Sequence, residues 1–413
     1  METQRLEVRS PVRLILPVLA ACVVAGSVFL SGVLRQGPGK DIDTRYFFVA
    51  AKLWASGHSP YEMANYVSAF AAQFGVPPNN GYPYLPTSAF FVLPMALFDW
   101  QVAARLFSVL NFLAAMALFG GCWFLLRRTL GVPLRPFHWL WLVLGSTVGG
   151  TAGTIFTGQT SVFIAAAGVA ALVGIRTRQP WLTVIGMVIA TAKPQLSFPL
   201  LPFLAAFQLR EWKALAAAAA VTATAVAVAA VLDGNLVRNF QASLTSYSAA
   251  DVNNVAKGFG FAGFLHGLGI PSSWASLLGI LLCLAVLGRA AWVVIRAGKS
   301  PAAHPGVLVL LTLAAGLALP LHSYDTCCYA LAITLTAATR PQLQAAMILP
   351  TLLVWRPNFL PNLLARFLPT FREGAAALGA ADGLLIAGWL FLLMAAFITA
   401  GGKQRAPGGG GTT

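Results

Sequence analysis

The sequence DIDTRYFFVAAKLWASGHSPY, residues 41–61, follows the first apolar run and determines how the rest of the chain is interpreted. It is polar in a chain that is otherwise mostly apolar, and it contains two of only 12 acidic residues, Asp41 and Asp43. Residues 44–56 have the pattern of an amphipathic helix, and residues 62–74 form a second candidate helix. Carboxylates beside a membrane segment are costly, so we expect one of the two to be functional.

The composition of the chain is typical of a membrane protein. Hydrophobic residues make up 58% of it and charged residues only 9%, whereas a soluble domain has about 25% charged residues. Apolar runs recur from Leu14 to Ala400. They do not alternate with polar residues, which favours helices over a β-barrel. We therefore predict an all-α polytopic membrane protein in contact with membrane lipids.

The formal charge of +15 fits the same class of protein. Lys and Arg cluster in short loops between the apolar runs, where basic residues keep a loop cytoplasmic. We therefore expect no nucleic-acid partner. The five cysteines form no C-x-x-C motif, and carboxylates outside the apolar runs are too few for a clear ligand set, so we expect neither a metal ion nor a cofactor.

The basic clusters predict the layout of the chain. Residues 1–12 form a cytoplasmic head, residues 13–400 a single transmembrane domain, and residues 401–413 a Gly-rich, disordered cytoplasmic tail. The loops at 35–100 and 233–271 then lie on the outer side, and the first of them carries the amphipathic helices. Both termini are expected in the cytoplasm.

Two short apolar runs, at about 180–192 and 195–209, lie on either side of Lys193 and Pro194. Each is too short to cross a bilayer comfortably. The pattern predicts either two short helices or one broken pair.

In this layout, polar residues from many separate segments fall on the outer side. Random placement would distribute them over both faces, so they are candidates for a common site. They are Asp43, Tyr61, Tyr84, Gln159, Lys193, Asn253, Asn254, His322 and Asp325.

Each candidate also has a simpler role. Lys193 could extend its amine to the membrane interface, although a lysine before a proline in a broken helix favours a phosphate contact. His322 could bond a backbone carbonyl, and Asp325 could be the partner of Tyr324, His322 or an arginine. The tyrosines could be interfacial aromatic residues, Gln159 could satisfy a helix end, and Asp41 could be a solvated loop charge.

An ordered set of short motifs resembles glycosyltransferase family 87, the polyprenol-phosphate-mannose-dependent α-mannosyltransferases and their relatives. The resemblance covers roughly residues 13–340. In chain order the motifs comprise Asp43, Phe47, Ala50, Gly57 and Tyr61; Tyr84, Pro86 and Pro94; Asn111; Gly158-Gln159; Lys193-Pro194; Arg210, Trp212 and Lys213; and His322 with Asp325. One departure is Ser161, because relatives usually have Asn two places after the glutamine.

The resemblance implies a GT-C-type bundle of about 11–13 transmembrane helices. It also implies inverting transfer of a mannose-like hexose from a polyprenyl-phosphate donor to a lipid or glycan acceptor. The active site would face outward from the bacterial inner membrane. Asp43 would be the general base, and Lys193, with Arg45 or His322, would stabilise the departing phosphate. The implied substrate-binding residues are Lys193, His322, Asp325, Gln159, Tyr84, Tyr61, Arg45 and Asn254.

Two other classes of protein remain open from the sequence. A transporter or flippase would also have about a dozen spans with intramembrane charges, but it would usually show internal repeats and charges at mid-membrane. A structural membrane subunit would be consistent with the low charge content.

Overall fold

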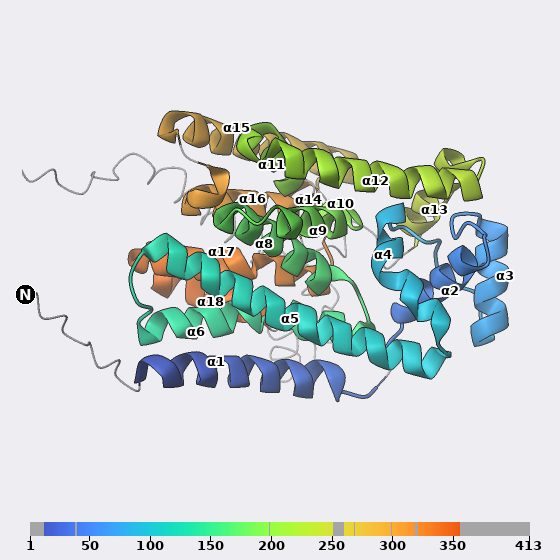
Figure 1. Cartoon of the computed structure of the whole chain (residues 1–413), viewed down its shortest axis with the longest axis horizontal. Helices are drawn as coiled ribbons and strands as arrows, with labels where there is room; N and C mark the ends of the chain where they lie inside the picture. Colours follow the sequence, from blue (N-terminus) through green and yellow to red (C-terminus); the bar gives the residue numbers. More distant parts are fainter. Residues whose placement is uncertain are drawn as a thin grey trace, which may run out of the picture.

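The computed structural model describes residues 12–355, apart from residues 38, 198, 251–259, 268, 299, 319 and 320. Every regular element in this part of the chain is a helix, and the long helices lie along one common direction (Figure 1). The predicted all-α class is therefore confirmed. The helices of the first half are α1 (Val12–Val28), α2 (Thr44–Ala55), α3 (Met63–Phe74), α4 (Ala89–Val92), α5 (Trp100–Leu130), α6 (Pro136–Ser146), α7 (Gly149–Thr157), α8 (Ser161–Thr177) and α9 (Pro180–Thr191).

The second half continues the same bundle. Its helices are α10 (Pro194–Ser197), α11 (Leu200–Phe207), α12 (Trp212–Leu232), α13 (Leu236–Ala249), α14 (Phe261–Gly267), α15 (Ser272–Ala297), α16 (Pro305–Ala318), α17 (Ala330–Thr339) and α18 (Gln344–Trp355). A π turn, η1 (Phe29–Val33), extends α1, and a 3-10 turn, η8 (Ser323–Tyr329), leads into α17.

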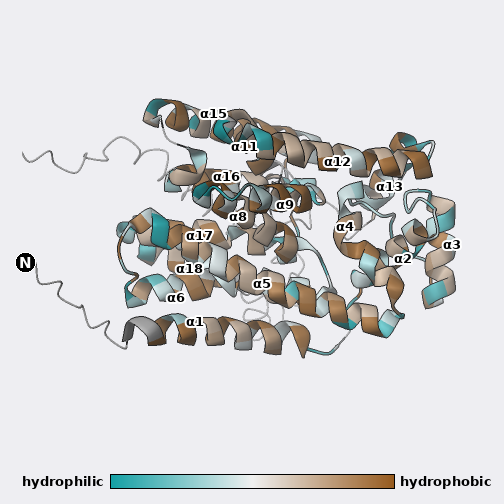
Figure 2. Cartoon of the chain, in the orientation of Figure 1, coloured by the Kyte–Doolittle hydropathy of each residue, from teal (hydrophilic) through white to brown (hydrophobic). Residues whose placement is uncertain are grey.

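Five helical segments among the described residues are long and apolar enough to cross a membrane, and four more are apolar but shorter. Figure 2 shows that hydrophilic residues gather near helix ends and in loops. The protein is therefore a multi-pass membrane protein. The five long segments are Ile15–Val33, Trp100–Leu130, Pro136–Thr157, Trp212–Leu232 and Ser272–Ala297; the shorter ones are Pro86–Leu97, Ser161–Thr177, Pro180–Thr191 and Pro305–Leu317.

Helices α2, α3, α4 and α13, from the two segments predicted as loops, lie together at one end of the bundle (Figure 1). The two helices predicted in the first loop are present as α2 and α3, within one residue at each end. The buried face of α2 is aromatic: the Phe47 ring lies 4.7 Å from that of Tyr84 and 5.4 Å from that of Phe107, between ring centroids. These contacts fix the loop against α5, because aromatic pairs bury large areas.

Some predicted boundaries differ from the structure. The loop at 233–271 contains two helices, α13 and α14, because Leu236 and Phe240 give α13 an apolar side that packs on the core. The apolar segment Pro136–Thr157 is divided into α6 and α7. The break expected at Lys193 and Pro194 is present, since α9 ends at Thr191 and α10 begins at Pro194. The end of the predicted transmembrane domain, beyond residue 355, and the tail at 401–413 lie outside the described residues.

The end of α7 meets the start of α2 at Gly158. Gly158 ends α7 in the left-handed conformation, with φ +74°, and a Cβ atom there would lie 1.6 Å from Thr44 Oγ1. Only glycine satisfies both requirements, because it lacks the Cβ that disfavours positive φ. The close approach brings the first outer loop onto the end of α7.

Substitution Gly158→Ala should therefore destabilise the protein much more than Gly75→Ala. Gly75 ends α3 at the same φ, +74°, but a Cβ there meets nothing within 4 Å. Both changes carry the left-handed penalty of about 1–2 kcal/mol, and only Gly158→Ala also displaces Thr44. The Tm of each variant in detergent measures the difference. Equal shifts would show that the contact with Thr44 adds nothing.

Candidate active site

The loop before α2 is fixed to the last turn of α7 by its backbone. The Asp41 N–H donates to the Phe156 carbonyl at 2.9 Å, and the Asp43 N–H donates to the Thr157 carbonyl at 2.8 Å. These are carbonyls of the last turn, which an ending helix leaves without internal partners. Asp43 itself occupies the N-cap position of α2, makes no capping bond with its side chain, and is half-buried as a residue. It is thus held at the junction of two helices.

The surroundings of Asp43 favour its protonated form more than water does. Burial raises the pKa of the Asp43 carboxyl to about 6, against the combined effect of hydrogen bonds from Thr157 and Gln159 and of the Lys193 charge, which lower it. Desolvation dominates because the charged form loses hydration when it is surrounded by protein. A carboxylate with a pKa near 6 is ionised at neutral pH and is still basic enough to accept a proton in a reaction.

Gln159 links Asp43 to two tyrosines. Tyr84 donates its hydroxyl proton to Gln159 Oε1 at 2.6 Å, so the amide Nε2 faces the opposite way. Nε2 donates to the Tyr324 hydroxyl at 3.4 Å, and the Gln159 side chain also bonds Asp43. Since the amide oxygen is occupied by Tyr84, the amide nitrogen is directed towards the carboxylate.

A buried ion pair lies next to this group. Lys193 Nζ is 2.5 Å from Asp325 Oδ1 and 2.8 Å from Ser161 Oγ, and Ser161 in turn donates to Asp325 Oδ1 at 2.5 Å. Lys193 is 2% exposed and Asp325 only 1%. The Lys193 side chain therefore does not extend to the membrane interface. The sequence analysis offered Tyr324, His322 or an arginine as the partner of Asp325; in the structure Asp325 pairs with Lys193 and also accepts the His322 backbone N–H.

His322 and Tyr324 complete the cluster. Asp325 Oδ2 accepts the His322 backbone N–H at 2.9 Å, and His322 Nε2 lies 3.1 Å from the Tyr247 hydroxyl. The rings of His322 and Tyr324 are stacked with centroids 4.9 Å apart, and Lys193 Nζ lies 5.0 Å from the Tyr324 centroid. Tyr324 thus contacts both the Asp43–Gln159 side and the Lys193–Asp325 side of the site.

The structure brings together most residues of the predicted site, but not all. Asp43, Tyr84, Gln159, Lys193, His322 and Asp325 form one continuous group. Tyr61 is buried behind it and donates to the Tyr84 carbonyl at 2.6 Å, so it supports Tyr84. The Arg45 guanidinium lies over the Phe74 ring, 5.2 Å from its centroid, on α3. Asn253 and Asn254 lie outside the described residues.

Three residues of the cluster were not among the predicted site residues: Ser161, Tyr247 and Tyr324. Ser161 attracted attention only as a departure from the family pattern, and its hydroxyl bridges the ion pair. Tyr324 lies in the sequence between two predicted site residues, His322 and Asp325. This position could have identified Tyr324 as a further candidate for the site. Tyr247 lies on a helix that the sequence analysis assigned to a loop, so nothing in the sequence pattern directed it to the site.

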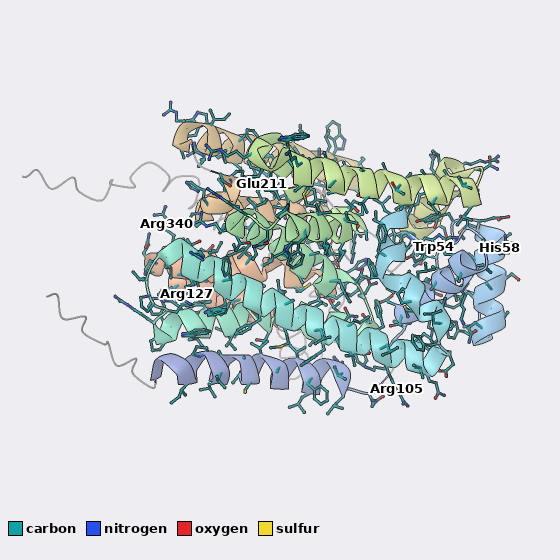
Figure 3. All side chains as sticks on the ribbon, viewed as in Figure 1. Trp54, His58, Arg105, Arg127, Glu211 and Arg340 are labelled. Carbon is teal, nitrogen blue, oxygen red and sulfur yellow. The ribbon has the colours of Figure 1, made fainter. Side chains whose placement is uncertain are left out.

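The site lies towards one end of the bundle. Figure 3 shows Arg127 and Arg340 towards one end, and Trp54, His58 and Arg105 towards the opposite end. The loop with Asp43 joins α1 to α2 at that opposite end (Figure 1). Among the described residues, no group of three or more His, Cys, Asp or Glu could hold a metal ion.

The fold and the site define a polytopic membrane protein with a polar, partly buried site near one end of its helix bundle. The chain belongs to glycosyltransferase family 87: the sequence model of that family matches residues 82–320, more than half of the 413 residues. The resemblance found in the sequence is confirmed, and the chain is a membrane glycosyltransferase that uses a sugar donor and an acceptor. None of the curated proteins compared with the chain matches it.

The matched range contains Tyr84, Gln159 and Lys193 but ends before His322 and begins after Asp43. The family match therefore supports the transferase class, and the argument for Asp43 rests on geometry. The family match also favours a glycosyltransferase over the alternatives that the sequence left open, which were a transporter, a flippase and a structural membrane subunit.

If the reaction needs the ionised form of Asp43, activity should decline as the pH falls through about 6, the pKa of this carboxyl. Substitution Thr157→Val removes the largest of the interactions that lower this pKa. The acid limb of kcat/KM should then move to higher pH. Profiles of both proteins between pH 5 and 8 measure the shift. A Thr157→Val profile that stays in place would show that another group sets the limb.

Substitutions of Lys193 and Asp325 should have strongly coupled effects on the stability of the protein. Either Lys193→Met or Asp325→Leu alone leaves a buried charged group without its partner, which typically costs about 3–5 kcal/mol. The double variant Lys193→Met, Asp325→Leu should be less destabilised than the sum of the single changes. Thermal unfolding of the four proteins completes the cycle. Additive losses would mean that the two charges are independent.

Proposed function

We propose that the protein transfers a hexose from a polyprenyl-phosphate donor to a lipid or glycan acceptor, with inversion at the anomeric carbon. The observation that supports this most directly is the Asp43 carboxylate, whose pKa of about 6 suits a general base, beside a cluster of hydrogen-bonding side chains. An inverting transfer needs one such carboxylate and no covalent intermediate on the protein.

In the proposed step, an acceptor hydroxyl attacks the anomeric carbon of the donor. Asp43 takes the hydroxyl proton while the bond between that carbon and the phosphate oxygen breaks. The electron pair of the broken bond leaves with the polyprenyl phosphate, and the new glycosidic bond has the opposite anomeric configuration. Gln159 holds the Asp43 carboxylate in orientation for this transfer, because its amide is itself fixed by Tyr84.

We assign the departing phosphate to the side of the site that carries Lys193 and His322. Donors and positive charge placed where negative charge develops stabilise a transition state most when they are already in position. Lys193 is fixed by Ser161 and Asp325, so it would act without reorganisation. Arg45 would first have to leave the Phe74 ring, and this makes it the weaker member of the predicted clamp.

We further propose that the site faces outward from the bacterial inner membrane, with both termini in the cytoplasm. Basic residues favour the cytoplasmic side, and Arg127 and Arg340 lie at the end opposite Trp54 and His58 (Figure 3). The single transmembrane domain at 13–400 and a mannose-like sugar are part of the same proposal. Both rest on the sequence pattern and the family resemblance.

Asp43→Asn should abolish transfer and leave a folded protein. Loss of a general base typically lowers the rate about 100-fold to 10,000-fold. Because burial raises the Asp43 pKa, the folded state is favoured below its unfolded pKa and loses that advantage as the pH rises through 6. The Asn variant should therefore be at least as thermostable as the wild type at pH 7. Transfer from labelled polyprenyl-phosphate hexoses and Tm together test this.

Asp41→Asn is the matched control. Asp41 lies two residues away and has φ 54°, a conformation that Asn also tolerates, so the loop should keep its shape and most of its activity. If the Asp41 variant is inactive and the Asp43 variant is active, the assignment of the base is wrong. If both retain full turnover, the proposed mechanism fails.

A further inference from the structure

Helix α13, from the second outer loop, reaches the site. Most of its side chains are exposed, and Ser243 is its buried residue. Phe240 nevertheless packs on Tyr61, with ring centroids 5.2 Å apart, and Ser243 donates to the Tyr82 carbonyl at 2.8 Å. One turn later, the Tyr247 hydroxyl lies 3.1 Å from His322 Nε2. These residues follow one face of the helix, and that face lies against the first outer loop and the site.

The helix is held closely at this face. A Cβ atom on Gly81 would lie 2.5 Å from Ser243 Oγ and 3.0 Å from Ser243 Cα, so the backbone of the first loop approaches α13 directly. Just before the helix, Asp233 accepts a hydrogen bond from Ser59 at 2.7 Å. The position of Tyr247 is therefore set by contacts that α13 and the residues just before it make with the first loop.

The His322 imidazole has two side-chain contacts. Its Nε2 lies 3.1 Å from the Tyr247 hydroxyl, within hydrogen-bond distance, and its ring is stacked on that of Tyr324 with centroids 4.9 Å apart. The His322 backbone is fixed separately, because its carbonyl accepts the Asp325 N–H at 2.9 Å and its own N–H donates to Asp325 Oδ2. The bond to Tyr247 is therefore a contact of the imidazole that a change at Tyr247 alone would remove.

We propose that Tyr247 is a positioning residue of the transferase site: its hydroxyl bonds Nε2 of His322 and fixes the imidazole in its stacked position on Tyr324. The inference deepens the proposed function and depends on it for the role of His322. It assigns α13 a part in the reaction, because the second outer loop would contribute to donor binding by orienting a side chain of a distant segment. A fixed second partner is the usual means of orienting a functional imidazole.

The test uses the full chain with Tyr247→Phe, which removes the hydroxyl and keeps the ring. We expect kcat/KM for the polyprenyl-phosphate donor to fall about tenfold, the effect of one hydrogen bond. In a His322→Gln background, Tyr247→Phe should have no further effect, since it acts through His322. Losses that multiply would overturn the proposal, because Tyr247 would then act independently of His322.

A second measurement does not depend on catalysis. The chain has only five histidines, so nitrogen-15 labelling of histidine gives few signals, and His322→Gln identifies the one of interest by its loss. We expect the Nε2 signal of His322 to shift in Tyr247→Phe and to stay in place in Thr245→Ala, which removes an exposed hydroxyl that bonds the Gln241 carbonyl within α13. An unchanged His322 signal in Tyr247→Phe would contradict the proposal even in a fully active enzyme. If the wild type transfers no sugar, the proposed function fails. The nitrogen-15 measurement still shows whether the Tyr247 hydroxyl bonds His322.

Discussion

The site depends on one buried pair of opposite charges. Lys193 and Asp325 are almost fully shielded from solvent, in a chain with few charged residues. Either charge alone would be expensive at this depth, and the two are tolerated because each is close to the other and hydrogen-bonded to Ser161. The pair ties the break between α9 and α10 to the start of η8 and to the first residue of α8. The ion pair therefore sets the positions of His322 and Tyr324, because both residues are close to Asp325 in the chain.

The broken helix pair illustrates the same dependence. Where a helix is broken inside a membrane, its free backbone N–H and C=O groups need hydrogen-bond partners. Here the Ala192 carbonyl accepts the Leu85 N–H at 3.2 Å. Leu85 directly follows Tyr84, which bonds Gln159. The segment that satisfies the break is thus the segment that orients the glutamine beside Asp43. The loop with Tyr84 and Leu85 therefore does two things: it supplies a hydrogen-bond donor at the helix break, and it orients Gln159 in the site.

Much of this could be predicted from the sequence, and the limits have physical causes. Low charge and long apolar runs gave the helical membrane class, and amphipathic periodicity located α2 and α3 because local patterns encode local structure. The break at Pro194 was visible for the same reason. The pairing of Lys193 with Asp325 was not, because these residues are 132 positions apart and nothing local links them. Helix α13 was missed because its segment is polar compared with the apolar runs around it, although Leu236 and Phe240 are four positions apart, as on one face of a helix.

The distances along the chain between these partners also constrain how the protein is made. Asp43 emerges early in synthesis, Gln159 and Lys193 follow, and Tyr324 and Asp325 come only after most of the helices have been inserted; Gln159 and Tyr324 are separated by 165 residues. During that interval Lys193 lacks Asp325, its partner in the ion pair. The pair can form only after η8 has been synthesised, when every described α-helix except α17 and α18 already precedes it in the chain.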